Sequence, residues 1–279
     1  MTFSDLALSQ RLERAEGFSC AQYAEARRLQ FPESSSEWME CGGAFVVFDR
    51  VNSPCTQTFG LGIFEELSNA TLDMIEQFFR ERGAAVMHEV SPFAGVAALD
   101  LLCQRNYRPL ELSSVLYRPV ALPSEPAPPS GPAQPGVTVR VAGPDEATLW
   151  SRISAEGWAH DHPEMSAILL ELGQVTAARR QSVCFLAELD GVPGAAGVLS
   201  IHEGVALFAG SATVPALRRR GLQTALLEAR MRYAFEHDCD LAMMVAWIGS
   251  NSQRNAERRG FQVAYTRTKW KLLDAQPEA

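Results

Sequence analysis

A proline-rich stretch divides this chain, and it limits the possible folds more than any other feature. Residues 121–136 read ALPSEPAPPSGPAQPG, with six prolines and few side chains that could fill a core. Proline fixes the backbone dihedral φ and lacks an N–H donor, so this composition predicts an extended, exposed connector. The sequence therefore predicts two domains, at residues 1–120 and 137–279, joined by a linker at residues 121–136.

The two halves resemble each other weakly, at a nearly constant offset. ERGAAVMHEV (Glu81–Val90) is similar to EHDCDLAMMV (Glu236–Val245), and RNYRPLELSSVLYRP is similar to RGFQVAYTRTKWKLL. In each copy a helix leads to an apolar strand, a second helix and a final alternating strand. Asn106 and Gly260 occupy equivalent places, and both residue types tolerate the left-handed conformation that ends a helix. The shared offset favours an internal duplication over chance similarity.

The C-terminal half alternates between strand and helix patterns. Val137–Val141 alternates as a half-buried strand does, and the proline and acidic residues after it are typical of a helix start. A second helix is predicted over residues 166–180. Three strands follow, with hairpin turns at Asp190-Gly191 and Glu203-Gly204. The remaining pattern is helix, strand, helix, strand (residues 222–233, 241–247, 251–259 and 261–272). This order predicts an α/β fold of the layered α+β kind.

Charge and cysteine usage argue against several classes of protein. The net charge of −8 and the sequence pI of about 5.2 do not fit the broad basic surface of a nucleic-acid-binding protein. Six scattered cysteines without a Cys-x-x-Cys pair predict reduced thiols in a cytoplasmic protein, with no disulfide framework and no metal site. Neither a signal peptide nor an apolar run of the roughly 20 residues that span a bilayer is recognisable. We therefore expect no nucleic-acid or membrane partner, and a monomer or homodimer.

Three consecutive arginines precede a predicted helix in VPALRRRGLQTALL (Val214–Leu227). If Val214 ends a strand and Gly221 begins a helix, the arginines lie in a short loop at a helix N-terminus. Backbone N–H groups there lack intrahelical partners and the helix dipole adds partial positive charge, so the loop can bind phosphate. From spacing alone, an amphipathic helix with a solvated basic start explains the run equally well. DNA binding has no supporting motif.

The same stretch resembles the acyl-CoA-binding motif, Q/R-x-x-G-x-G/A, of the GNAT superfamily of N-acyltransferases. Arg218 and Gly221 match the motif, while Gln223 replaces the usual small residue. SNSQRNAERRGF, from Ser250, resembles the helix and Gly-Phe pair that follow later in the superfamily. The resemblance covers most of residues 137–273. It implies a GNAT-like domain, a mixed and mostly antiparallel sheet flanked by helices, in each half of the chain.

What the resemblance implies about ligands is a site for acetyl-CoA as cosubstrate. Its pyrophosphate would lie on the loop and helix start, and its pantetheine arm would pair with the preceding strand. Arg219 or Arg220 would reach the 3′-phosphate. Asn255 would contact the cofactor from the later helix, although an exposed helical asparagine is an equally simple explanation. The implied cofactor-binding residues are Ala212, Thr213, Val214, Arg218, Arg219, Arg220, Gly221, Leu222, Gln223, Thr224 and Asn255.

The N-terminal half is a degenerate copy by the same comparison. IFEELSNA (Ile63–Ala70) stands where the arginine loop would be, with two glutamates and neither arginine nor glycine. Carboxylates at a phosphate site would repel the ligand. We therefore expect one cofactor site per chain, in the C-terminal half.

The groups that would move protons are harder to identify. Many members of the superfamily place a glutamate on the strand before the loop and a tyrosine four residues before the terminal glycine. Here that strand, Val205–Val214, has no acidic residue, and the tyrosine position is Ala256. Tyr265 and Glu203 are the candidate catalytic residues, against the alternatives of a half-buried structural tyrosine and an exposed turn.

A polar cluster, GWAHDHPE, offers further candidates between the first two predicted helices. His160, Asp161, His162 or Glu164 would accept a proton or recognise a cationic acceptor, unless the segment is an ordinary polar loop. Two functions stay open. One is an N-acetyltransferase acting directly on a small-molecule or peptide amine, and the other is a non-catalytic acyl-CoA-binding or regulatory protein.

The placement of the cofactor can be tested with Arg220→Glu. This substitution puts a carboxylate beside the expected phosphate site, so we expect weaker binding of acetyl-CoA without unfolding. Isothermal titration calorimetry measures the affinity, and circular dichroism checks the fold. An unchanged affinity would exclude this placement.

Overall fold

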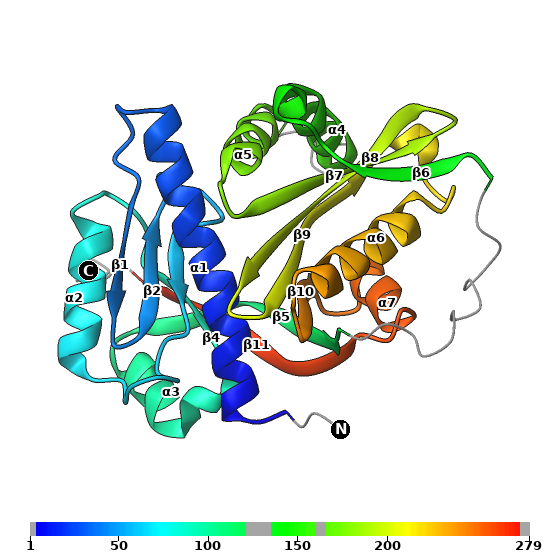
Figure 1. Ribbon diagram of the computed structural model, residues 1–279. Coiled ribbons are helices and arrows are strands. Elements are labelled where there is room, and N and C mark those ends of the chain that lie inside the picture. Colours follow the sequence, from blue (N-terminus) through cyan, green and yellow to red (C-terminus); the bar gives the residue numbers. More distant parts are fainter. Residues whose placement is uncertain (1–3, 121–134, 160–165, 274–279) are drawn as a thin grey trace. The chain divides into compact units, whose positions relative to one another are not determined.

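The chain forms two compact units, each built on strands with helices packed against them. The computed structural model describes residues 4–120, 135–159 and 166–273 (Figure 1). The first unit comprises Met1–Tyr117 and Val245–Ala279, and the second comprises Arg118–Met244. The chain passes between them within two strands, β5 (Tyr107–Pro119) and β10 (Leu241–Trp247). Most of the linker predicted at residues 121–136 lies outside the described residues.

The strands of the first unit follow the sheet order β1-β2-β3-β4-β11-β5. Neighbouring strands are antiparallel except for β3 and β4, which are parallel. The elements not yet given are α1 (Leu6–Gln30), β1 (Glu37–Cys41), β2 (Ala44–Phe48), β3 (Gln57–Phe59), α2 (Asn69–Arg80), β4 (Met87–Val90), α3 (Gly95–Gln104), α7 (Asn251–Glu257) and β11 (Gln262–Leu272).

Helices cover both faces of this sheet, which explains why β2 is apolar at every position. Phe45 and Val47 pack with Ala21 and Ala24 of α1. The alternate residues of β2 face a second core, shared with α2, α3 and the aromatic side chains Tyr107 and Trp270. Since successive side chains of a strand point to opposite faces, a continuous apolar run predicts burial on both sides.

The second unit has a mixed, mostly antiparallel sheet in the order β10-β9-β8-β7-β6. A first core lies between α4 and the sheet, where Trp150 packs with Leu186, Ala196 and Val198. Its elements besides β10 are β6 (Val137–Val141), α4 (Ala147–Ala159), α5 (Ser166–Ala178), β7 (Ser182–Leu189), β8 (Val192–His202), β9 (Val205–Thr213) and α6 (Leu222–Glu236).

Several local predictions are confirmed. The two hairpin turns are present, with left-handed φ angles of 51° at Asp190 and 47° at Glu203. The equivalent residues Asn106 and Gly260 both adopt positive φ, 64° and 81°, after α3 and α7. The α+β class with a mixed sheet also matches.

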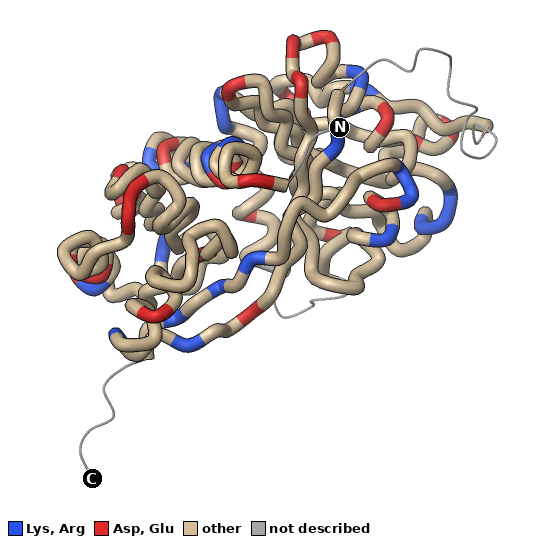
Figure 2. Tube along the Cα trace, turned by 90° about the horizontal axis from the view of Figure 1, so that it is seen from below, with Lys and Arg blue, Asp and Glu red and all other residues tan. Residues whose placement is uncertain are grey.

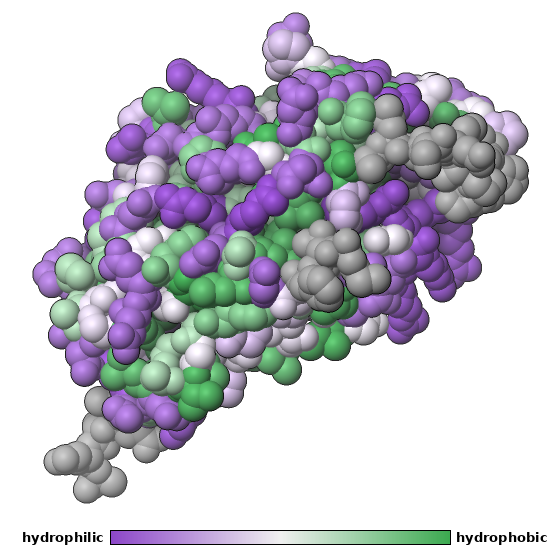
Figure 3. All heavy atoms as spheres, turned by 60° about the horizontal axis from the view of Figure 1, so that its bottom comes forward, coloured by the Kyte–Doolittle hydropathy of each residue, from purple (hydrophilic) through white to green (hydrophobic). Residues whose placement is uncertain are grey.

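The surface is mixed in charge and hydropathy. Figure 2 shows Lys and Arg interspersed with Asp and Glu along the trace. Figure 3 shows apolar side chains reaching the surface among polar ones on the face it presents. Within the described ranges, no helix combines the length and apolar character needed to cross a bilayer.

The last strand of the chain, β11, lies inside the sheet of the first unit. It pairs with β4 on one side, with Trp270 opposite His88, and with β5 along almost its whole length on the other side (Figure 1). The contacts therefore group residues 245–279 with residues 1–117, whereas the sequence predicts boundaries at residues 120 and 137. The first unit is completed by the end of the chain.

Removing β11 should unfold the first unit. We expect a chain ending at Phe261, and residues 1–120 alone, to lose amide protection in β4 and β5, because each strand then loses its ladder with β11. Hydrogen–deuterium exchange with mass spectrometry measures this, and a chain ending at Leu273 is the control. Native protection of β4 and β5 in residues 1–120 alone would contradict the interdependence.

Candidate functional site

The strand β9 is hydrogen-bonded along one edge but only partly along the other. Its pairing with β8 spans most of its length, from Val205 to Thr213. Its parallel pairing with β10 comprises three residues, Val205, Ala206 and Leu207. Beyond Leu207, the described residues give β9 no ladder with β10, so the sheet does not use this edge of the strand there.

The arginine loop joins this strand to α6 through unusual backbone conformations. A short 3₁₀ turn, Pro215–Leu217, follows Val214. Arg219 then has φ of 63°, and Gly221 has φ of 83° as the N-cap of α6. The helix prediction is confirmed, with Leu222 as its first residue. The left-handed φ at Gly221 explains the glycine, because a side chain there would strain the backbone.

The first turn of α6 leaves its N–H groups unsatisfied. Gly221 provides no side-chain cap, and within the described part of the chain the N–H groups of residues 219–223 have no acceptor. Three other helices are capped by a side-chain oxygen, from Asp5, Ser68 and Ser250. The α6 N-terminus therefore presents free donors together with the positive end of the helix dipole.

The three arginines of the loop differ in their surroundings. Arg218 is partly buried and donates from Nη2 to the carbonyl oxygen of Gly157, at 2.9 Å, and from Nε to that of Thr213, at 3.3 Å. Its side chain thereby ties α4 to the end of β9. Arg219 and Arg220 are exposed. These two cations are the ones available to an anion at the helix start.

The other predicted cofactor residues of the second unit are close to this loop. Gln223 Nε2 donates to Thr213 Oγ1 at 2.7 Å, so its side chain is held against the end of β9. Val214 N–H donates to the Gly194 carbonyl at 2.9 Å. Ala212 lies against Gly157, where an added Cβ would come within 2.7 Å of it. Ala212, Thr213, Val214 and residues 218–224 thus form one continuous region.

The remaining predicted site residues are separate from that region in sequence and environment. Asn255 is an exposed residue of α7, in the first unit. Glu203 lies in the turn between β8 and β9 with its side chain 73% exposed and 4.0 Å from His202 Nε2. His160, Asp161, His162 and Glu164 lie outside the described residues. The catalytic assignments of Glu203 and Tyr265 stay predictions.

Tyr265 is buried in the first unit as part of a charged network. Its hydroxyl donates to Glu13 Oε1 at 2.9 Å, and Arg267 lies 3.1 Å from Glu13, 2.6 Å from Glu16 and 3.0 Å from Glu89. Burial raises the pKa of Glu13 to about 7, with Arg267 opposing that rise. Burial also raises the pKa of Tyr265 well above its ordinary value.

Two features of the site were missed by sequence reasoning. Ser211 Oγ is buried on β9 and has no hydrogen-bond partner among the described residues. Trp150 is fully buried on α4 and donates to the carbonyl oxygens of Phe185 and Gly197, at 3.1 and 3.3 Å. A serine in SAT and a tryptophan in a helix carry no local signal for these positions, since both depend on contacts distant in sequence.

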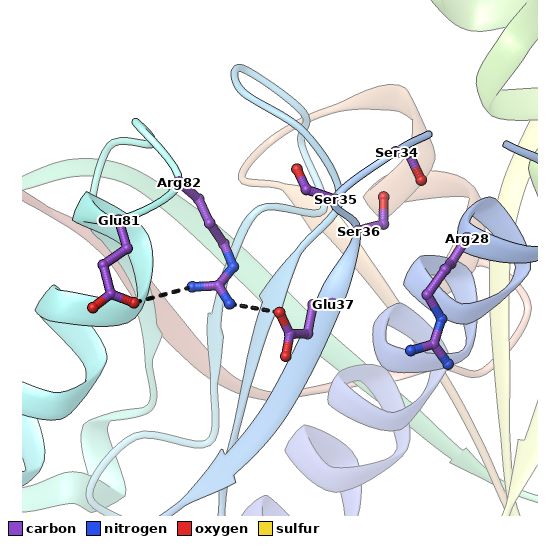
Figure 4. Close-up of a pocket in the computed structure, with 7 residues that line it drawn as sticks. All are labelled: Arg28, Ser34, Ser35, Ser36, Glu37, Glu81 and Arg82. Atoms are coloured by element: carbon purple, nitrogen blue, oxygen red, sulfur yellow. Dashed lines mark hydrogen bonds and ion pairs between the residues drawn. The ribbon is translucent and has the colours of Figure 1, made fainter. Parts of the chain in front are cut away.

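An open groove of about 500 Å³ lies elsewhere, in the first unit (Figure 4). Arg28, Arg82 and three serines line it, together with Glu37 and Glu81. Arg82 is already engaged, because it lies 2.5 Å from Glu37 and its guanidinium stacks 3.9 Å from the Phe78 ring centre. The two carboxylates offset the arginines, so this groove lacks the free donors of the α6 N-terminus.

Comparisons with known proteins agree with the geometry of the second unit. A model of the acetyltransferase (GNAT) family matches residues 147–261, which include β9, the arginine loop and α6. The matched segment, residues 147–261, resembles this family. No curated protein matches the sequence.

Solved structures share the fold along nearly the whole chain. A GCN5-related N-acetyltransferase from Kribbella flavida has 19% identity and a TM-score of 0.62, covering 92% of this chain and 96% of its own. One from Sphaerobacter thermophilus has 16% identity and a TM-score of 0.54, covering 84% and 82%. A tandem GNAT protein from the clavulanic acid biosynthesis pathway has 12% identity and a TM-score of 0.54, covering 99% and 98%.

The first unit should become less stable as pH rises, because the buried Glu13 carboxyl then loses its proton. A pKa raised from 4.5 to about 7 stabilises the folded state below pH 4.5, and this contribution is lost as pH rises through 7. We expect Glu13→Gln to remove a contribution of about 3 kcal/mol from this pH dependence. Amide exchange of β4 and β11 between pH 4.5 and 8 measures it.

The control for this experiment is Glu33→Gln, which removes a carboxylate at an exposed position. A Glu13→Gln profile parallel to that of the wild type would show that Glu13 does not retain its proton.

Proposed function

We propose that this chain is an N-acetyltransferase that transfers the acetyl group of acetyl-CoA directly to an amine. One observation carries the proposal. The α6 N-terminus has free N–H donors at residues 219–223, a left-handed Gly221 in place of a capping side chain, and the exposed cations Arg219 and Arg220. This combination suits a pyrophosphate, which needs several donors and positive charge at short range.

The adjoining strand suits the rest of the cosubstrate. The pantetheine arm carries amide groups, and the part of β9 beyond Leu207 has backbone groups that no ladder with β10 uses. An extended arm along this edge would add main-chain hydrogen bonds, as a further strand does. Its thioester would then lie along β9, between the open strand edge and the buried Ser211 hydroxyl.

The chemistry proposed is a single displacement at the thioester carbonyl. The neutral amine nitrogen attacks the carbonyl carbon, and a tetrahedral intermediate carries negative charge on oxygen until the C–S bond breaks. The nitrogen loses one proton, and the departing thiolate of CoA gains one. Backbone N–H groups of β9 would stabilise the oxyanion. No metal takes part in this scheme, and the acceptor is a small-molecule or peptide amine.

We further propose that the first unit is a degenerate copy without a cofactor site. At the equivalent position, Ser68 caps α2 by accepting from the N–H of Thr71 at 3.1 Å. One of the free donors that a phosphate needs is therefore already satisfied there, and Glu65 and Glu66 add negative charge nearby. This supports one acetyl-CoA per chain. A cytoplasmic monomer or homodimer is proposed on the sequence expectations alone.

A second function, acyl-CoA binding without catalysis, is favoured by two observations. The hydroxyl of Tyr265 is engaged with Glu13, and β9 has no acidic residue. Release of free CoA from acetyl-CoA in the presence of a panel of amines and peptides separates the two functions. Turnover supports the transferase, and tight binding without turnover supports the binding protein.

The proposed phosphate site at the start of α6, residues 219–223, can be tested with a pair of glycine substitutions. Gly221→Ala places a Cβ where φ is 83°, and Gly191→Ala places one where φ is 78°, in the turn between β7 and β8. Both strain the backbone similarly, but only the first alters the α6 N-terminus. We expect Gly221→Ala to weaken acetyl-CoA binding by about tenfold or more, the effect of losing one charge-assisted hydrogen bond.

Calorimetric titration with acetyl-CoA measures both variants. Equal affinities of the Gly221→Ala and Gly191→Ala proteins would count against a phosphate site at the start of α6.

A further inference from the structure

Arg230, in the middle of α6, is a buried cation whose described partners are all uncharged. Its side chain is 1% exposed, and it donates to the carbonyl oxygens of Leu226 and Val198, each at 3.2 Å, and of Ala209 at 3.4 Å. No carboxylate pairs with it among the residues that the structure describes. Burial lowers its pKa to about 10, so it stays charged at neutral pH. A buried charge without a counterion is costly, and the three carbonyl dipoles stabilise it together with the Phe208 ring, whose centre is 4.9 Å from the Arg230 Cζ.

Two of these carbonyls flank a bulge between β8 and β9. Ala196 is opposite Ala212, and Val198 is opposite Ala209, so one residue of β8 faces Gly210 and Ser211 of β9. Such a bulge re-aims the strand and leaves backbone groups outside the ladder. Gly210 has φ of 56°, which a glycine adopts without strain.

The bulge is held from two helices. Trp150 of α4 donates to the carbonyl oxygen of Gly197, the β8 residue at the bulge. Arg230 of α6 lies so close to Gly197 that an added Cβ would be 3.2 Å from its Cζ. Figure 1 shows α4 and α6 on opposite sides of β8 and β9. Trp150 donates to the Gly197 carbonyl, and Arg230 donates to the carbonyls of Val198 and Ala209, so both helices satisfy buried carbonyls at the bulge.

The contact with Ala209 has an electronic consequence for the next residue. The Ala209 carbonyl and the Gly210 N–H belong to one peptide group, and in a trans peptide they point in opposite directions. A charged donor on the carbonyl polarises the peptide and makes its N–H a stronger donor. Gly210 lies in the part of β9 that has no described ladder with β10.

We propose that Arg230 is a positioning residue that fixes the β8–β9 bulge and strengthens the Gly210 N–H as a donor to the acyl carbonyl of acetyl-CoA. The role of the Gly210 N–H as a donor to acetyl-CoA rests on the proposed function. The role of Arg230 in fixing the bulge does not depend on it. Arg230 touches neither the ligand nor the acceptor in this scheme. It acts through the Ala209–Gly210 peptide.

The structural part is tested in the ligand-free protein by amide exchange of residues 209–212. We expect Arg230→Met to exchange there about tenfold faster than the wild type, as for loss of one hydrogen bond to a charged group. Arg230→Lys, which keeps the charge, should restore part of the protection. Arg232→Met is the matched control, because Arg232 is an exposed arginine of the same helix. Equal exchange in Arg230→Met and Arg232→Met would overturn the inference.

The electronic part is tested by the infrared carbonyl band of bound acetyl-CoA labelled with ¹³C in the thioester carbonyl. We expect binding to the wild type and to Arg232→Met to lower the band frequency, and Arg230→Met to return it toward that of free acetyl-CoA. Affinity in Arg230→Met should change by less than about threefold, because the phosphate cradle is untouched. A contribution of Arg230 to folding alone, with no effect on the bulge or its peptides, would leave the band unchanged.

Gly197→Ala provides a second perturbation that keeps the arginine and displaces its guanidinium. It should shift both readouts in the same direction, and it replaces Arg230→Met if that variant does not fold. An Arg230→Met band identical to that of the wild type would overturn the electronic role while leaving the proposed function intact. Failure of the wild type to bind acetyl-CoA would overturn the proposed function, and the electronic role with it.

Discussion

The end of the ladder between β9 and β10 is the constraint on which the site depends. If the two strands stayed paired beyond Leu207, the backbone groups of β9 would be used within the sheet and no ligand could pair with them. The bulge opposite Gly197 coincides with this open stretch, and Val214 leads from it directly into the arginine loop. An open strand edge, an uncapped helix and two exposed cations thus follow one another along a single segment.

The contrast between the two units shows how small a local change decides whether a helix start can bind an anion. In the first unit a serine caps α2 and occupies a donor, whereas in the second Gly221 leaves the donors of α6 free. A serine and a glycine at the N-cap differ little in their effect on helix stability. They differ in whether the first backbone N–H groups are satisfied by a side chain or left free for a ligand. Under the proposed function, the two units would share an architecture while the second alone kept a phosphate site.

Local features of the fold could be predicted from the sequence, and distant pairings could not. The turns at Asp190-Gly191 and Glu203-Gly204 and the glycine entry to α6 depend on residues adjacent in sequence. The insertion of β11 between β4 and β5 depends on pairing with residues far away in the sequence. An alternating strand pattern does not indicate which strands it will pair with. The same holds for Ser211 and Arg230, because SAT and EARMR look ordinary until the bulge brings their partners together.

The two most buried arginines solve the same electrostatic problem in opposite ways, and this difference bears on function. Arg267 is surrounded by Glu13, Glu16 and Glu89, so its charge is neutralised locally and its field outside the network is weak. Arg230 is surrounded by carbonyl dipoles, which stabilise the charge without cancelling it. Its field therefore extends through the peptides of β9, whose ladder with β10 ends at Leu207. A buried cation in that place favours negative charge developing along the strand, which is what acyl transfer requires.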